Sequence, residues 1–280
     1  MTWKIIVDSG CNFRELPNLA AGVQFVNVPL TIQVGEQIFV DDAGLDIDQM
    51  MDLMYATPTA SKSACPSPEA YRQALEGASK AIIITITGTL SGSNNSARLG
   101  SEMYLEEHPE AQVHIFDSLS AGGEQDLLAL KLNDLIASGL GFEDVVAELK
   151  TYHRSTKLAF ALAKVDNLVK NGRLSKLVGT VVGLLNIRMV GQASDEGTLE
   201  LLQKARGQKK AVTAVIEEMV KAGYKGGRVM ISHRNNDKIC EQITEGLTAK
   251  FPNATIQSIP TSGLCSFYAE EGGILLGYEI

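Results

Sequence analysis

Two hydrophobic patterns divide the chain. In the first half, short aliphatic and β-branched runs end at a polar residue or a glycine, as in WKIIVDSG, AIIITITG and AQVHIFDS. Between and after these runs, apolar residues recur every three to four positions, which is the spacing of an amphipathic helix. The pattern predicts strands within 3–10, 81–88 and 111–118, alternating with helices within 46–57, 67–78, 93–108 and 125–139. Such alternation predicts a parallel sheet that is covered on both faces.

The second half has a less regular rhythm. After residue 152, strand-like runs such as KLAFALA, IRMVGQA and RVMISHR are interrupted irregularly by helical patterns. The predicted fold class is therefore α/β with two domains: a Rossmann-like parallel-sheet domain at 1–152, and an α+β domain with a mostly antiparallel sheet at 153–280. The chain has no long linker, so we expect the domains to pack closely, with the ligand between them.

Composition narrows the class of protein. The 280 residues are 45% hydrophobic and carry a formal net charge of -8, which argues against a nucleic-acid partner held by bulk electrostatics. No apolar stretch approaches the ~20 residues of a membrane span, and MTWKIIVDSG does not read as a signal peptide. The four cysteines lack the paired spacing of a zinc site, so we expect no metal, free thiols and a cytoplasmic location.

The turn after the second strand, TGTLSGSNNSARLG, allows three interpretations. A hydrolase elbow needs G-x-S-x-G, but here Gly88 lies one place too far from Ser91. A phosphate loop would need a lysine that the turn lacks. There remains a helix N-terminus, capped by Ser91 or Ser93, whose amides suit an anion such as a carboxylate. A plain helix cap and a Ser91-dependent hydrolase or acyl transferase, with His233 as base, stay open as alternatives.

A second hydroxyl-rich turn, SKSACPSPEAY, strengthens the anion interpretation. Ser67 is the expected N-cap and Pro68 the first residue of the next helix, and Ser63 lies just upstream. The carboxyl ends of parallel strands meet at one edge of a sheet. Two such turns in one crevice would form a polar site the size of a carboxylate.

Two further groups of residues could belong to a site. Met50, Met51 and Met54 share a helix, and LVGTVVGLLNI is an apolar run with glycines; both suit a flexible apolar ligand or an ordinary core. Basic residues recur in LVKNGRLSK, NIRM and LQKARGQKKA, which would suit a phosphate or a docking partner, or simply form a solvated surface.

Several motifs, taken in order, resemble the DegV family of bacterial fatty-acid-binding proteins over nearly the full length. They are VDSG, VPLTIQVGEQIFVDD, KSACPSPEAY, LSGSNNSA, VDNLVKNGRLSK, LLNIR and ARGQKKA. The resemblance implies a carrier that encloses one long-chain fatty acid in an apolar tunnel and has no catalytic residue or cofactor of its own. It also implies a partner, a fatty acid kinase that uses ATP to make an acyl-phosphate for phospholipid synthesis. A lipid sensor without a kinase partner is the alternative, and lipid exchange would involve transient contact with a membrane surface.

The resemblance also implies roles for individual residues. Ser63 and Ser91 match the family's hydroxyl positions and, with Ser93 beside them, are expected to bind the carboxylate. Arg173 and Arg206 match its basic surface near the ligand opening, to which we add Arg188 and Lys209. The residues expected to line the acyl chain are Met50, Met54, Val182 and Leu185.

The C-terminal segment departs from the family. Many members end in His-x-Gly-Pro-Gly, whose histidine helps to hold the carboxylate, whereas this chain places Tyr268 at that position and Glu270 and Glu271 at Gly-Pro. A tyrosine hydroxyl donates a hydrogen bond but brings no positive charge. We therefore expect Tyr268 to bind the carboxylate more weakly than histidine would, or the ligand to be less charged. Alternatively Tyr268 only packs, and Ser262, Ser266 or Cys265 takes the polar role.

Overall fold

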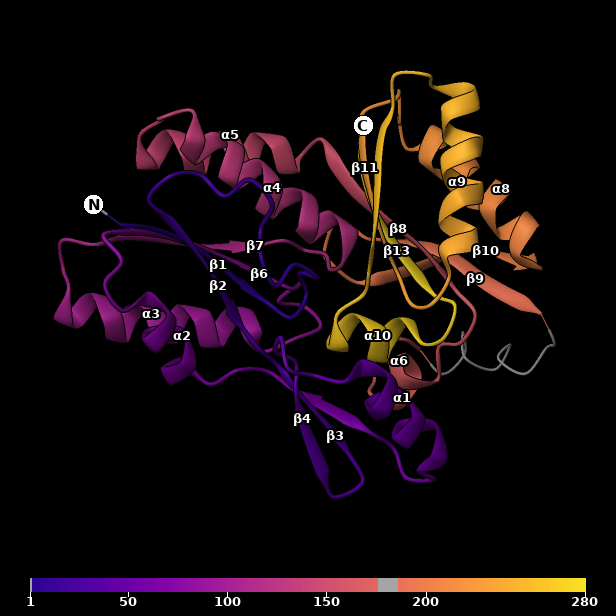
Figure 1. Ribbon diagram of the computed structural model, residues 1–280, viewed down its shortest axis with the longest axis horizontal. Helices are drawn as coiled ribbons and strands as arrows, with labels where there is room; N and C mark the ends of the chain where they lie inside the picture. The colour runs from indigo at the N-terminus through magenta and orange to yellow at the C-terminus, as the bar shows by residue number, and fades with distance from the viewer. Residues whose placement is uncertain (1, 176–185) are drawn as a thin grey trace.

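The computed structural model describes residues 2–175 and 186–280 (Figure 1). A four-stranded parallel sheet, in the order β2-β1-β6-β7, forms the centre of the first half. Its strands are β1 (Trp3–Asp8), β2 (Val23–Val28), β6 (Lys80–Thr85) and β7 (Gln112–Asp117). The parallel sheet predicted from the alternating pattern is confirmed.

Helices cover both faces of this sheet because successive side chains of a strand point to opposite faces. Ile5 and Val7 pack against α4 (Gly123–Ala137) and α5 (Phe142–His153). Ile6, between them, packs against α2 (Pro68–Leu75) and α3 (Ser93–Glu107). The unbroken apolar run of β1 therefore reflects burial on both sides.

A small sheet that the hydrophobic pattern did not predict lies beside this domain. It has the order β4-β3-β5 and consists of β3 (Thr31–Val34), β4 (Gln37–Val40) and β5 (Lys62–Ala64). Helix α1 (Ile47–Ala56) begins at Asp46, whose side chain accepts a hydrogen bond from Gln49 N, and packs on β3.

The second half is built on a six-stranded sheet in the order β10-β9-β8-β13-β11-β12. All neighbours are antiparallel except β11 and β12, which confirms the predicted mostly antiparallel sheet. The strands are β8 (Thr156–Leu162), β9 (Ile187–Ala193), β10 (Leu199–Arg206), β11 (Arg228–His233), β12 (Thr255–Pro260) and β13 (Ile274–Glu279). Helices α8 (Gln208–Lys221) and α9 (Asp237–Lys250) cover one face; the short helices α6 (Asp166–Lys170) and α10 (Gly263–Ala269) lie on the other (Figure 1).

The two halves are in direct contact through α4. A Cβ on Gly123 would lie 2.2 Å from the carbonyl oxygen of Met230 and 2.6 Å from the amide nitrogen of Gly277, so only glycine lets the helix approach the second sheet this closely. The chain passes from α5 to β8 at residues 154–155. Whether 1–152 and 153–280 behave as separate domains stays a prediction.

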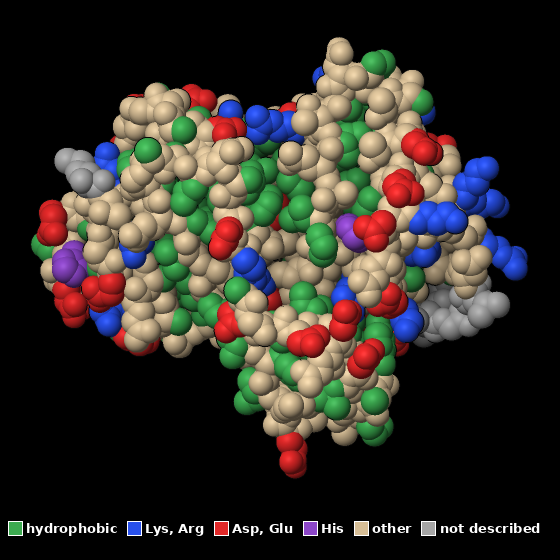
Figure 2. All heavy atoms as spheres, viewed as in Figure 1, with side chains coloured by type: hydrophobic (Ala, Val, Ile, Leu, Met, Phe, Trp, Pro, Cys, Tyr) green, Lys and Arg blue, Asp and Glu red, His purple; other side chains and the backbone are tan. Residues whose placement is uncertain are grey.

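Charge is distributed unevenly over the surface. Figure 2 shows acidic side chains scattered over the visible face, whereas Lys and Arg side chains gather at its right edge, the side where α8 and β10 lie in Figure 1. Within the described ranges 2–175 and 186–280, no helix combines the length and apolar character needed to cross a bilayer.

Candidate functional site

An apolar pocket lies between the carboxyl ends of β6 and β7 and the face of the second sheet that α10 covers. The space between atoms in it, together with the solvent at its open mouth, amounts to about 790 Å³. Ile86, Leu90 and Leu119 line it from the first half, and Phe160 and Leu275 from the second.

Strand β8 provides one wall because its large side chains all fall on one face. Leu158, Phe160 and Leu162 point to the pocket, whereas the intervening Ala159 and Ala161 pack under α8. This alternation gives the pocket a bulky apolar wall and leaves room for a helix on the opposite face.

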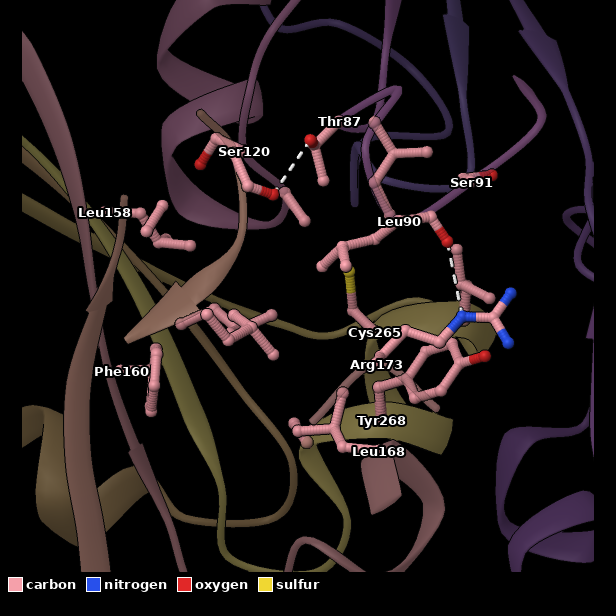
Figure 3. A pocket seen from close by; sticks show the side chains of 18 of the residues that line it. Thr87, Leu90, Ser91, Ser120, Leu158, Phe160, Leu168, Arg173, Cys265 and Tyr268 are labelled. Carbon is pink, nitrogen blue, oxygen red and sulfur yellow. Dashed lines mark hydrogen bonds between the residues drawn. The ribbon is translucent and has the colours of Figure 1, made fainter. Parts of the chain in front are cut away.

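The pocket has a polar end, lined by Ser63, Ser91, Arg173 and Tyr268, which come from separate segments; Figure 3 labels the last three. Ser63 Oγ lies 2.7 Å from the Tyr268 hydroxyl, and the Arg173 guanidinium carbon lies 5.9 Å from the centroid of the Tyr268 ring. Arg173 Nε donates to the carbonyl of Leu90 at 3.2 Å, and Ser91 follows Leu90 in the same loop. The hydroxyls of Ser63 and Tyr268 thus lie beside a guanidinium, which is an arrangement suited to a carboxylate.

Tyr268 acts at this end as a neutral hydroxyl. Burial raises its pKa above the usual value near 10, since removing the proton would leave a charge away from water. The hydrogen bond to Ser63 and the nearby Arg173 charge oppose this shift but are smaller effects. At neutral pH Tyr268 can therefore donate a hydrogen bond, and the positive charge at this end comes from Arg173.

The loop that carries Ser91 is shaped by its own backbone and by Asp8. Ser91 N donates to the carbonyl of Thr87 at 3.2 Å, and Ser91 Oγ accepts from Ser93 N at 3.3 Å. The N-cap of α3 is Gly92, so neither Ser91 nor Ser93 is the capping residue that the sequence suggested. The buried Asp8 carboxylate also accepts from Ile86 N, at 3.0 Å to each of its oxygens, which fixes the start of the loop.

Comparison with known proteins agrees with this architecture. The model of the DegV family of uncharacterised proteins matches residues 2–279. The chain belongs to the DegV family. A DegV domain-containing protein of Streptococcus pneumoniae strain R6 is 66% identical over 280 residues, which is the whole of both chains.

Solved structures of DegV relatives match over almost the full length. The Streptococcus pneumoniae Fatty Acid Kinase B3 protein loaded with linoleic acid has a TM-score of 0.99 at 66% identity, covering 100% of both chains. A DegV family protein from Eubacterium eligens loaded with heptadecanoic acid has a TM-score of 0.95 at 35% identity, covering 99% of both chains.

Of the residues that the sequence proposed for the carboxylate of this DegV protein, the structure brings Ser63, Ser91 and Tyr268 to the pocket and places Ser93 elsewhere. Ser93 is fully buried; its hydroxyl donates to Asp8 Oδ2 at 2.5 Å and lies 2.6 Å from the Tyr71 hydroxyl. Helical geometry explains the difference, because Ser93 begins α3 and turns inward toward the sheet. Its role is to hold the loop.

The methionines expected along the acyl chain also lie elsewhere. Met50 and Met54 pack with Ile32, Val34 and Phe267 between α1 and the small sheet, and neither lines the pocket. The core interpretation left open from the sequence describes them better, because the apolar face of α1 meets β3. Val182 and Leu185 lie outside the described residues.

The basic residues do not form one patch. Arg173 belongs to the pocket, and the half-buried Arg188 donates to the carbonyl of Gly272 at 2.9 Å and to Gln208 Oε1 at 3.1 Å. Burial lowers the pKa of Arg188. Only Arg206 and Lys209 of the four are exposed, at the end of β10 and the start of α8.

The described lining of the pocket offers no base that could activate Ser91 as a nucleophile. Among the described residues that line the pocket there is no histidine and no carboxylate to act as general base. His233 lies outside the pocket, where its Nδ1 accepts from Asn236 N at 3.2 Å. Burial raises the pKa of the Cys265 thiol, which keeps it protonated and unreactive.

Sequence reasoning missed two features of the site. It assigned Arg173 to a surface patch, because a basic residue after a glycine turn gives no sign of which way it points. It also missed the β8 wall, although a signal existed: in KLAFALA, large and small apolar residues alternate, which is typical of a strand with a cavity on one face and a helix on the other.

Proposed function

We propose that this protein binds one long-chain fatty acid in the pocket, with the carboxylate against Ser63, Ser91, Tyr268 and Arg173. The observation that carries the proposal is the combination, in one pocket, of largely apolar walls with an end where Ser63, Tyr268 and the guanidinium of Arg173 lie close together. A fatty acid has the same division into an apolar chain and one anionic group.

The energetics favour such a ligand. Each buried methylene contributes about 0.8 kcal/mol, so most of the affinity would come from the walls. Hydrogen bonds to a charged group contribute about 1.5–3 kcal/mol each and would offset the cost of removing the carboxylate from water. The fatty acids bound in two DegV structures support the same ligand class.

In this proposal the protein is a carrier that presents its fatty acid to a fatty acid kinase, which forms the acyl-phosphate. The name of the Streptococcus pneumoniae relative, a Fatty Acid Kinase B3 protein, supports a kinase partner. The exposed Arg206 and Lys209 would assist docking or phosphate transfer. We place the activity in the cytoplasm, in keeping with the free thiols of Cys11, Cys65, Cys240 and Cys265, with transient contact to a membrane surface for lipid exchange.

Removing both serine hydroxyls tests the placement of the carboxylate. We expect the double variant Ser63→Ala with Ser91→Ala to bind hexadecanoic acid at least about 100-fold more weakly, because it loses two hydrogen bonds to a charged group at about 1.5–3 kcal/mol each. Titration calorimetry measures the change. The matched control is Ser138→Ala with Ser155→Ala, which removes two hydroxyls that bond backbone carbonyls outside the pocket. Equal affinity of the two double variants would show that the carboxylate lies elsewhere.

A second assay separates the carrier from a sensor and from a hydrolase. The lipid-loaded protein, supplied with a fatty acid kinase and ATP, should yield acyl-phosphate, and a sensor would yield none. Ester hydrolysis by the purified protein that disappears in Ser91→Ala would instead support the enzyme alternative.

A further inference from the structure

The apolar pocket ends at a wall that it shares with a second, outward-facing cleft. Leu119, Leu158 and Ala193 line both spaces and so form the wall between them. On the far side of the wall, the lining becomes charged. The cleft is also lined by Glu124, His153, Arg154, Lys157 and Asp195.

This wall lies at the far end of the pocket from the polar end. Figure 3 shows Leu158 on the opposite side of the pocket from Ser91 and Arg173, with Cys265 between them. A fatty acid whose carboxylate lies at Arg173 would therefore extend its chain toward Leu158.

Leu119, which the first half of the chain contributes to the wall, is held in place by its backbone. Leu119 has a φ of 49°, a left-handed conformation that is rare for a bulky residue, and its amide donates to Asp117 Oδ1 at 3.0 Å. The next residue, Ser120, accepts from Thr87 N at 2.9 Å through its carbonyl. A Cβ on Gly197 would lie 3.1 Å from Leu119 Cα, so the turn between β9 and β10 packs directly against Leu119.

The second-half side is equally fixed. Leu158 is 2% exposed and sits on β8, opposite Gly277 of β13. Ala193 ends β9 and is paired with Leu199 of β10. Leu158, which is paired within the sheet, cannot move aside for an extra methylene without breaking ladder hydrogen bonds.

We propose that Leu119, Leu158 and Ala193 set the longest acyl chain that the pocket accepts. The inference rests on the proposed function. Up to the wall, each added methylene increases affinity about fourfold by burial. A longer chain must fold back in the pocket or enter the cleft, where charged side chains such as Glu124 and Lys157 lie beside it and a methylene gains less from burial.

Four variants test the wall, with saturated acids from tetradecanoic to docosanoic competing against a fluorescent fatty acid. Leu158→Ala and Leu119→Gly open the wall, and glycine also suits the φ of residue 119, so this variant keeps the fold. Ala193→Leu thickens it. Leu168→Ala is the matched control, since Figure 3 shows Leu168 beside Tyr268, away from the wall.

We expect the wild-type affinity to rise with chain length and then to level off or fall. In Leu158→Ala and Leu119→Gly the best chain should be longer by about two methylenes, since the leucine side chains lose at least three carbons. Ala193→Leu should prefer a shorter chain, and Leu168→Ala should bind every acid more weakly with the same best chain. Thermal melting of each variant establishes that it is folded.

The outcomes separate this inference from the proposed function. Variants that bind fatty acids but all share the wild-type best chain would overturn the role of the wall and leave the proposed function standing. A wild-type protein that binds none of the acids would overturn both.

Discussion

The polar end of the pocket owes its chemistry to four side chains that lie far apart in the sequence. Ser63 and Tyr268 are 205 residues apart and share a 2.7 Å hydrogen bond. Arg173 lies over the ring of Tyr268 and carries a permanent positive charge, which a tyrosine cannot supply. The sequence led us to expect weaker carboxylate binding because Tyr268 replaces a histidine. In the structure, Arg173 from another segment brings to this end of the pocket the positive charge that Tyr268 lacks.

Neutralising Arg173 should weaken binding of acids more than of alcohols. We expect Arg173→Gln to lower the affinity for hexadecanoic acid at least about tenfold, since a hydrogen bond to a charged group contributes roughly 1.5–3 kcal/mol. Hexadecanol has the same chain without the charge and should be affected less. The control Arg98→Gln removes an exposed arginine that pairs with Glu102 on α3. Equal losses for the acid and the alcohol would mean that Arg173 acts only through its bonds to the backbone.

Replacing Tyr268 by histidine should make binding depend on pH. Burial raises the pKa of Tyr268, so the hydroxyl is neutral at pH 6 and at pH 8 and contributes no pH dependence between them. Histidine, with an ordinary pKa of about 6.5, gains a positive charge as the pH falls and should then attract the carboxylate. We expect Tyr268→His to bind fatty acid more tightly at pH 6 than at pH 8, relative to Tyr268→Phe. The same pH profile for both variants would place residue 268 away from the carboxylate.

At the scale of elements, the turn between β9 and β10 links the two halves beside the pocket. Thr87 Oγ1 donates to the carbonyl of Gly197 at 2.9 Å, and Thr89 Oγ1 donates to that of Glu196 at 2.6 Å. Gly197 has a φ of 77°, and a Cβ there would lie 2.2 Å from Thr87 Oγ1. Both the backbone conformation and the close contact require glycine.

Alanine at this turn should therefore disturb the pocket as well as the backbone. Gly197→Ala and the control Gly77→Ala both force alanine into a left-handed conformation, at a cost of about 1–2 kcal/mol. Gly77 has no heavy atom within 4 Å of its added Cβ, so the control lacks the clash. We expect Gly197→Ala to melt at a lower temperature than Gly77→Ala and to release bound fatty acid faster. Equal melting and release rates would show that the turn does not help to close the pocket.

The elements that sequence predicted best are those with strong periodicity. The runs of β1, β6 and β7 are buried on one or both faces and alternate with amphipathic helices, so a parallel sheet follows from their pattern. The small sheet was not predicted because its strands have only three or four residues, and β4 is largely exposed. Periodicity also shows which face of α1 is apolar but not what covers it, so Met50 and Met54 could not be assigned from sequence.

At the scale of the whole molecule, the pocket exists because the carboxyl ends of β6 and β7 lie against a face of the second sheet. Sequence could place Ser91 after the end of a parallel strand. It placed Ser63 in a turn beside it, whereas Ser63 lies on β5 of the small antiparallel sheet. Sequence could not show that the large side chains of β8 face the pocket. That arrangement depends on long-range packing, such as the close approach of Gly123 to Met230 and Gly277, which leaves no local signal.

The central claim is that this pocket holds a fatty acid, and native mass spectrometry of the purified full-length protein tests it most directly. We predict one bound molecule per chain, with the mass of a long-chain fatty acid. Denaturation should release it, and added hexadecanoic or octadecanoic acid should exchange with it one for one. Protein that carries no lipid after purification, and that binds no acid from tetradecanoic to octadecanoic, would contradict the account.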